Sequence, residues 1–245
     1  MILSEKTKSW KQDRRFFTAM VAVIVGTVFL GFARSYFLAG AIQAKLPSLL
    51  VHFHAAVATL WILFLAIQIA LIATRRVAWH RQLGMFGAAL AVAMVVLALL
   101  TATESFARGF SPPGSKSSPA TFYVFPVFQA VTFCVLFAAG FLKRSDGAAH
   151  KRLMLIATFS ILGPAINRWP FAVIHQVPPL TSLIIFVLLL SLAGYDLWTR
   201  HRVHRATAIG GAFVIVSQML MFPIGRTQAW QHFAASVLKL WNAGG

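Results

Sequence analysis

Apolar residues run along this chain in long uninterrupted blocks, and short polar and basic clusters separate the blocks. Seven blocks approach or exceed the roughly 18 residues that a helix needs to cross a bilayer. They predict transmembrane helices over about residues 16–34, 51–73, 83–102, 121–142, 152–172, 179–198 and 206–224. The predicted fold is therefore all-α, a polytopic membrane helix bundle with a seven-helix transmembrane domain over residues 1–225.

Residues 226–245 follow a different pattern. Apolar side chains recur there at i, i+3, i+4, i+7, i+8 and i+11, namely Trp230, Phe233, Ala234, Val237, Leu238 and Trp241. This spacing predicts an amphipathic C-terminal helix that lies on the membrane interface or docks on the bundle.

Composition agrees with the membrane interpretation. The 245 residues are 59% hydrophobic and 11% charged, whereas a soluble domain carries about 25% charged residues. The net charge of +17 comes from basic clusters between apolar blocks, so the chain has no water-soluble basic face for nucleic acid. Its single cysteine excludes a disulfide framework.

The basic clusters also predict orientation. Fifteen of the 22 Lys and Arg residues fall at one set of predicted helix ends, including Arg75, Arg76, Lys143 and Arg144, and seven fall at the other set. Because cytoplasmic loops carry the excess of positive charge, we expect a cytoplasmic N-terminus and an external C-terminus. The expected location is a bacterial inner membrane, which the chain crosses several times.

Three similar words stand at the mouths of apolar blocks: WHRQLG at 79–84, AHKRLM at 149–154 and VHRAT at 203–207. Each contains a histidine followed by a cation. The histidines His80, His150 and His204 can ligate haem iron or another metal if they converge. The cations Arg81, Lys151, Arg152 and Arg205 can pair with haem propionates. The other interpretation is that all of these side chains simply sit at the membrane interface.

Polar side chains inside the predicted spans are the other candidate site residues. His54, Trp61 and Gln68 are seven residues apart, which places them on one helical stripe. Gln129, Asn167, Arg168, Asp196 and Gln218 complete the set. These side chains either hydrogen-bond between helices or line a site. Asp196 is expected to pair with an arginine or to orient a histidine.

The three histidine words, the His54–Trp61–Gln68 stripe and GRTQAW at 225–230 resemble a group of bacterial multispanning inner-membrane proteins of unknown function. That resemblance extends from about residue 50 onward and implies no particular activity. Histidines at helix mouths are also similar to those of the b561 and ferric-reductase type of di-haem cytochrome, which pair histidines at both membrane faces. Here three histidines share one level, and His54 lacks a partner at the other level.

These observations leave three functions open. The first is haem b binding near the cytoplasmic face through His80, His150 and His204, with electron transfer to or from quinone. The second is a zinc-dependent lipid-modifying enzyme similar to the ceramidase and adiponectin-receptor superfamily, although the expected HxxxH pair is absent from the last predicted span. The third is an accessory or assembly subunit of a larger membrane complex, whose basic helix mouths bind anionic lipid headgroups.

Overall fold

The computed structural model describes residues 2–38, 48–111, 117–177 and 179–244, and these residues form helices and connecting turns without a strand. The long helices are α1 (Ile2–Phe32), which continues as the π-helical turn η1 (Ala33–Phe37), α2 (Leu49–Ala73), α3 (Val77–Ala107), α4 (Pro119–Leu142), α8 (Leu180–Arg200) and α9 (Arg205–Gly225). Shorter helices are α5 (Gly147–Ser160), α6 (Gly163–Ile166), α7 (Ala172–Gln176) and α10 (Gln228–Ala243).

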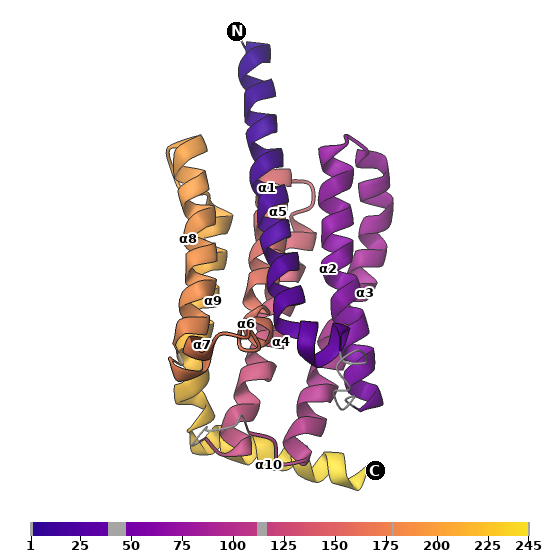
Figure 1. The fold of residues 1–245 in the computed structure, drawn as a ribbon, viewed down its shortest axis with the longest axis vertical. Helices are drawn as coiled ribbons and strands as arrows, with labels where there is room; N and C mark the ends of the chain where they lie inside the picture. Colours follow the sequence, from indigo (N-terminus) through magenta and orange to yellow (C-terminus); the bar gives the residue numbers. More distant parts are fainter. Residues whose placement is uncertain (1, 39–47, 112–116, 178, 245) are drawn as a thin grey trace.

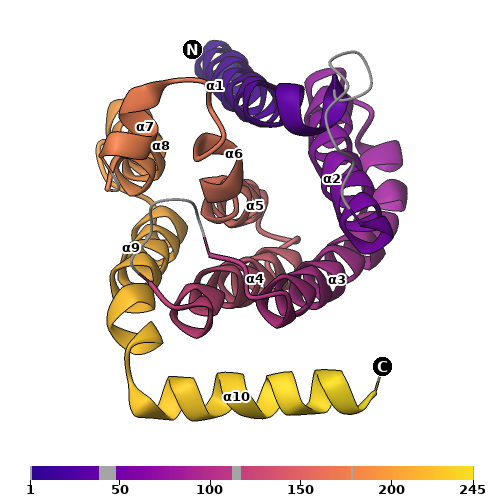
Figure 2. The same ribbon diagram turned by 60° about the horizontal axis from the view of Figure 1, so that its bottom comes forward.

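The long helices stand side by side and enclose α5 and α6 (Figures 1 and 2). Consecutive helices α1 to α4 pack against their neighbours, and α9 packs against both α4 and α5. From Arg152 to Ser160, every α5 side chain except Met154 is buried. A short helix therefore occupies the position that a hydrophobic core takes in a soluble protein.

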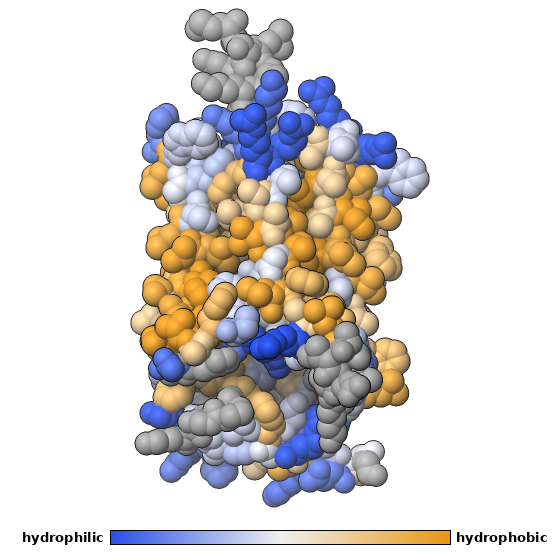
Figure 3. All heavy atoms as spheres, viewed as in Figure 1, coloured by the Kyte–Doolittle hydropathy of each residue, from blue (hydrophilic) through white to orange (hydrophobic). Residues whose placement is uncertain are grey.

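Within the described residues, six helices are long and apolar enough to cross a membrane: α1 with η1, α2, α3, α4, α8 and α9. Their outer surfaces keep large apolar side chains exposed, such as Leu190 and Ile209. Figure 3 shows these apolar atoms as a broad band between two more hydrophilic ends. Water would not tolerate so large an apolar surface, whereas lipid does. The prediction of a helical integral membrane protein is confirmed.

The predicted fifth span, 152–172, is not one continuous helix. The α5 helix has 14 residues, which gives it a length of only about 21 Å against roughly 30 Å of bilayer core. The helix ends because Pro164 has no N–H to donate and its ring would clash with the carbonyl of Ser160. The chain continues through the single turn α6 and the short helix α7 to α8.

Glycines allow the central segment to approach its neighbours. A Cβ added to Gly31 on α1 would lie 2.1 Å from the carbonyl oxygen of Ala165 in α6. A Cβ at Gly140 on α4 would lie 3.1 Å from the Cβ of Leu153 on α5. The contact at Gly31 requires glycine because a backbone atom blocks the added Cβ, and the contact at Gly140 leaves little room for a larger side chain. Both α1 and α4 therefore pack closely against the enclosed segment.

The C-terminal helix α10 lies across the end of the bundle opposite the N-terminus (Figure 1). Trp230 and Ala234 are buried against α3 and α4, and the Trp230 indole donates a hydrogen bond to the carbonyl of Ala120 (2.8 Å). Phe233 and Leu240 remain exposed on the same helix. The amphipathic helix is therefore docked on the bundle while it keeps an apolar side free. We call this end the α10 end, and we call the opposite end, where Arg75, Arg76, Lys143 and Arg144 lie, the basic end.

Candidate functional site

The first turn of α5 organises the basic end. Asp146 caps this helix by accepting hydrogen bonds from the N–H groups of Ala148 (3.0 Å) and Ala149 (3.1 Å). The hydrogen bond from Ala149 is the main cause that lowers the pKa of Asp146. The cap fixes the start of α5, and consecutive residues then project about 100° apart around the helix. His150, Lys151 and Arg152 consequently reach three different neighbours.

The imidazole ring of His150 lies next to that of His80 on α3. The two ring centroids are 6.2 Å apart and the ring planes are 80° apart. His150 Nδ1 lies 2.8 Å from the carbonyl oxygen of Gly140 on α4, so this nitrogen carries the proton and donates it. This contact leaves Nε2 as the nitrogen that could ligate a metal.

Buried polar atoms without partners adjoin this pair. The Nδ1 atom of His80 is buried and has no hydrogen-bond partner, and the same holds for both side-chain polar atoms of Gln68 on α2. The backbone of Gln68 lies next to the His80 ring. An unpaired buried polar group is costly and rare in folded proteins. These atoms could accept or donate hydrogen bonds to a further polar group beside His80 and Gln68.

Arg152 points to the other side of α5, where it forms a buried ion pair with Asp196 of α8. Their side chains are 1% and 0% exposed, and Arg152 Nε donates to Asp196 Oδ1 (2.9 Å). The other carboxylate oxygen accepts from the backbone N–H of His204 (3.1 Å) and from the Thr207 hydroxyl on α9. The expected pairing of Asp196 with an arginine is thus observed, and it joins three helices.

Lys151 points between these two directions, towards α1. Its Nζ atom lies 2.5 Å from Asp13 Oδ2, and the Tyr195 hydroxyl donates to the other oxygen of the same carboxylate. Two adjacent residues of α5 are therefore connected to two adjacent residues of α8. Lys151 is connected to Tyr195 through the carboxylate of Asp13, and Arg152 contacts Asp196 directly. Two parallel tethers hold α5 at the basic end.

His204 does not join the histidine pair. It is the residue that caps α9, and its Nδ1 atom accepts a hydrogen bond from the N–H of Ala206 (3.1 Å). Burial is the main cause that lowers its pKa, and the nearby charges of Arg152 and Arg200 lower it further. Both effects favour the neutral ring, which the cap requires because a protonated Nδ1 cannot accept. The cations Arg81 and Arg205 are exposed beside their histidines.

The remaining predicted residues lie away from the histidine pair. His54 sits fourteen positions before Gln68 on α2, roughly 21 Å along the helix, and its Nδ1 atom is buried without a partner. The Trp61 indole donates to Thr158 (3.3 Å). The side chains of Gln129 on α4 and Gln218 on α9 are half-buried.

Two of the predicted site residues, Asn167 and Arg168, lie just after α6. The Asn167 Oδ1 atom accepts a hydrogen bond from the Thr181 hydroxyl. Arg168 is exposed, donates to the carbonyl of Pro164 (2.8 Å) and lies over the Phe32 ring. Neither side chain reaches the basic end, so the two form a separate polar group.

The three histidine words therefore differ in role although their letters agree. Among the described residues, no group of three or more His, Cys, Asp or Glu side chains could hold a metal ion. What the fold brings together is a pair, His80 and His150, with Gln68 beside it.

Sequence reasoning did not identify Asp13 and Tyr195 as part of this end. A usable signal was present, because the chain has only five acidic residues against 22 Lys and Arg. With acids so scarce, each one near a basic cluster is a strong candidate for an ion pair.

Comparison of the chain with protein-family models, with curated proteins and with solved structures finds no match. Any functional assignment consequently rests on the residues themselves.

Proposed function

We propose that this integral membrane protein binds haem b at the basic end, where His80 and His150 would hold the group, and that it exchanges electrons with quinone in the bilayer. A haem bound in this way would supply one-electron chemistry, since the porphyrin iron cycles between two oxidation states. The contribution of the chain is to hold, orient and shield that group.

The observation that carries the proposal is the separation of the two rings. Two imidazoles that hold one iron must lie close together, since a metal–nitrogen bond is only about 2 Å long. The His80 and His150 centroids are 6.2 Å apart. They come from two different helices, α3 and α5.

The orientation of His150 also supports ligation. Metal-bound histidines usually donate their other ring N–H to a carbonyl or carboxylate, which fixes the ring and its tautomer. The contact of His150 Nδ1 with the Gly140 carbonyl has this form. Burial of the unpartnered Gln68 amide next to His80 gives a second polar group that would face the bound molecule.

The number of ligands favours haem over zinc. Zinc needs three or four protein ligands, and no third His, Cys, Asp or Glu joins the pair in the part of the chain that the structure describes. Haem iron takes four ligands from the porphyrin and only two from the protein. Of the four cations considered as propionate partners, Lys151 and Arg152 are engaged with Asp13 and Asp196. Exposed Arg81, adjacent to His80, is the best remaining partner.

The excess of positive charge at the basic end supports a cytoplasmic location for it. We therefore infer that the N-terminus faces the cytoplasm, that α10 lies on the external side, and that the chain resides in a bacterial inner membrane. The proposed haem would then lie near the cytoplasmic surface.

The test is a reduced-minus-oxidised absorption spectrum of protein purified after expression with a haem precursor, together with metal analysis of the same sample. A b-type α-band should appear in the wild type and disappear in His80→Ala and His150→Ala. The matched control is His204→Asn, which keeps the capping acceptor and should keep the band. Zinc without a band would instead support the lipid-enzyme alternative, and a colourless, metal-free protein would support the accessory-subunit alternative.

A further inference from the structure

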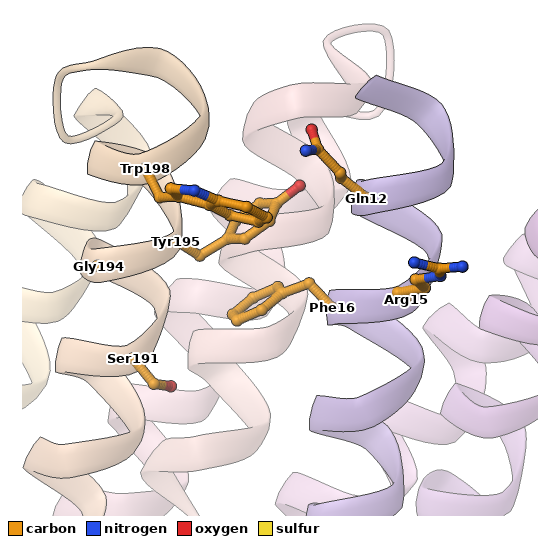
Figure 4. A pocket seen from close by; sticks show the side chains of 7 residues that line it. All are labelled: Gln12, Arg15, Phe16, Ser191, Gly194, Tyr195 and Trp198. Carbon is orange, nitrogen blue, oxygen red and sulfur yellow. The ribbon is translucent and has the colours of Figure 1, made fainter. Parts of the chain in front are cut away.

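A groove of ≈ 580 Å³ opens between α1 and α8 at the basic end, on the side of these helices away from the histidine pair. The groove is lined by Gln12, Arg15 and Phe16 on α1 and by Ser191, Gly194, Tyr195 and Trp198 on α8. Figure 4 shows Phe16 next to Tyr195 and Trp198, with Gln12 above them and the Arg15 side chain at the outer edge, on the side of α1 away from α8. Its volume lies within the roughly 300–1,000 Å³ that small-molecule sites occupy.

The groove exists because the face of α8 that lines it includes the small residues Ser191 and Gly194. Gly194 has no side chain, and a Cβ added there would meet no heavy atom within 4 Å. Phe16 and Tyr195 stack with centroids 4.0 Å apart and ring planes 10° apart. This stack forms an aromatic floor, and the hydrogen bond from Tyr195 to Asp13 fixes it in place.

The charge of the groove is positive. Arg15 is exposed and forms no ion pair with any described acidic residue. The carboxylate beneath the floor, that of Asp13, is already paired with Lys151. An anionic group would therefore meet an uncompensated guanidinium, with the Gln12 amide as a further polar neighbour.

The groove has the residue types that are typical of a membrane–water interface. Arginine and tryptophan side chains concentrate at membrane–water interfaces, and here Trp198 is 66% exposed. The basic end is hydrophilic, and the apolar band begins directly below it (Figure 3). The two stripes that line the groove continue into that band with Val23 and Val187, both exposed to lipid.

We infer that this groove binds the headgroup of one anionic phospholipid, with the phosphate at Arg15 and the acyl chains along Val23 and Val187. The aromatic floor and Trp198 would pack against the glycerol region. This site is separate from the proposed haem site, since its residues come from α1 and α8 and neither His80 nor His150 lines it.

The test measures lipid retention by native mass spectrometry on protein equilibrated with equal amounts of phosphatidylglycerol and phosphatidylcholine. The wild type should retain one phosphatidylglycerol in preference to phosphatidylcholine. Arg15→Gln should bring the two lipids to parity, whereas Arg205→Gln, which changes an exposed arginine on α9 at the same end, should keep the preference. An Arg15→Gln protein that keeps the wild-type preference would overturn the inference.

A second pair of variants tests the location without changing charge. Gly194→Leu fills open space in the groove and should abolish retention of the tightly held lipid. Gly84→Leu on α3 is the matched control, because Gly84 is also a helical glycine with no heavy atom near its added Cβ and it lies outside the groove. Equal retention by Gly194→Leu and Gly84→Leu would show that the lipid binds elsewhere. Helical circular dichroism identifies any variant that fails to fold, and the arginine pair then decides.

Discussion

At the scale of single residues, the tetrapeptide AHKR at 149–152 shows how a short word acquires several roles. The helix turns about 100° per residue, so His150 faces His80, Lys151 faces Asp13 and Arg152 faces Asp196. One turn of α5 thus supplies a ligand candidate and two tethers. In α5, the histidine and the two cations therefore make specific contacts with other helices and do not only mark the membrane interface.

The buried ion pair gives the first prediction. Arg152→Met or Asp196→Leu should destabilise the protein by about 3–5 kcal/mol, because each leaves one buried charge without its partner. The expected measurement is the thermal unfolding midpoint in detergent, followed by circular dichroism.

The matched control is the double variant Arg152→Met/Asp196→Leu, which removes both charges. It should be less destabilised than either single variant, since no unpaired charge remains. If the double variant lost the sum of the two single losses, the pair would not be coupled as described.

His204 gives a prediction about pH. Burial, Arg152 and Arg200 lower its folded-state pKa against the opposing effect of Asp196 and Asp146, so below the ordinary value of about 6.5 the unfolded state binds more protons than the folded state. The free energy of unfolding should therefore fall as the pH decreases from about 7 towards the folded-state pKa.

The variant that tests this is His204→Asn, which retains a capping acceptor but does not titrate in this range. Its unfolding midpoint should fall less than that of the wild type between about pH 7 and about pH 5.5. If the unfolding midpoints of the two proteins fell equally, His204 would not be the cause of the pH dependence. Asp146, whose pKa is also lowered, can only contribute below its own ordinary value of about 4.

At the scale of elements, the enclosed segment α5–α6 depends on close backbone packing. Gly31→Ala would place a methyl group 2.1 Å from the Ala165 carbonyl oxygen, and a backbone atom cannot move aside as a flexible side chain can. We expect a loss of about 1–3 kcal/mol from overpacking.

Gly26→Ala on the same helix is the control, because its added Cβ meets nothing. It should be neutral or stabilising, since alanine favours helix more than glycine does. Comparable losses of unfolding midpoint in both variants would indicate a general effect on α1 instead of a contact with α6.

The apolar blocks predicted six of the long helices closely; the expected span 51–73, for example, is α2 at Leu49–Ala73. The fifth block was misjudged because hydropathy does not distinguish burial in lipid from burial in protein, and α5 is surrounded by helices. Pro164 lies inside the expected span 152–172, and α5 already ends at Ser160. The break became visible only with the neighbouring helices in place.

The candidate site was also predictable only in part. The histidine words pointed to the basic end, but their shared letters could not show that His80 and His150 pair while His204 caps α9. That difference depends on the rotation of each helix about its axis, which a sequence does not fix when most faces are apolar. The contribution of Asp13 depends on a contact across 138 residues of sequence.

At the scale of the whole molecule, the charge asymmetry predicts orientation. In a Cys134→Ala background, which removes the single cysteine, Ser145→Cys lies exposed at the basic end and Ala229→Cys lies exposed at the α10 end. A membrane-impermeant maleimide should label Ala229→Cys in cells whose inner membrane is intact, and Ser145→Cys only after that membrane is opened. The reverse labelling pattern would show that the basic end faces outward and would contradict the predicted orientation.

The central proposal is that His80 and His150 would hold one haem. Electron paramagnetic resonance of the oxidised protein, with haem quantified per chain, tests it most directly. We predict one low-spin haem in the wild type and in His204→Asn, and loss of the haem or conversion to a high-spin form in both His80→Ala and His150→Ala. A wild type without haem after expression with the precursor, or a low-spin signal that survives either alanine substitution, would contradict the account.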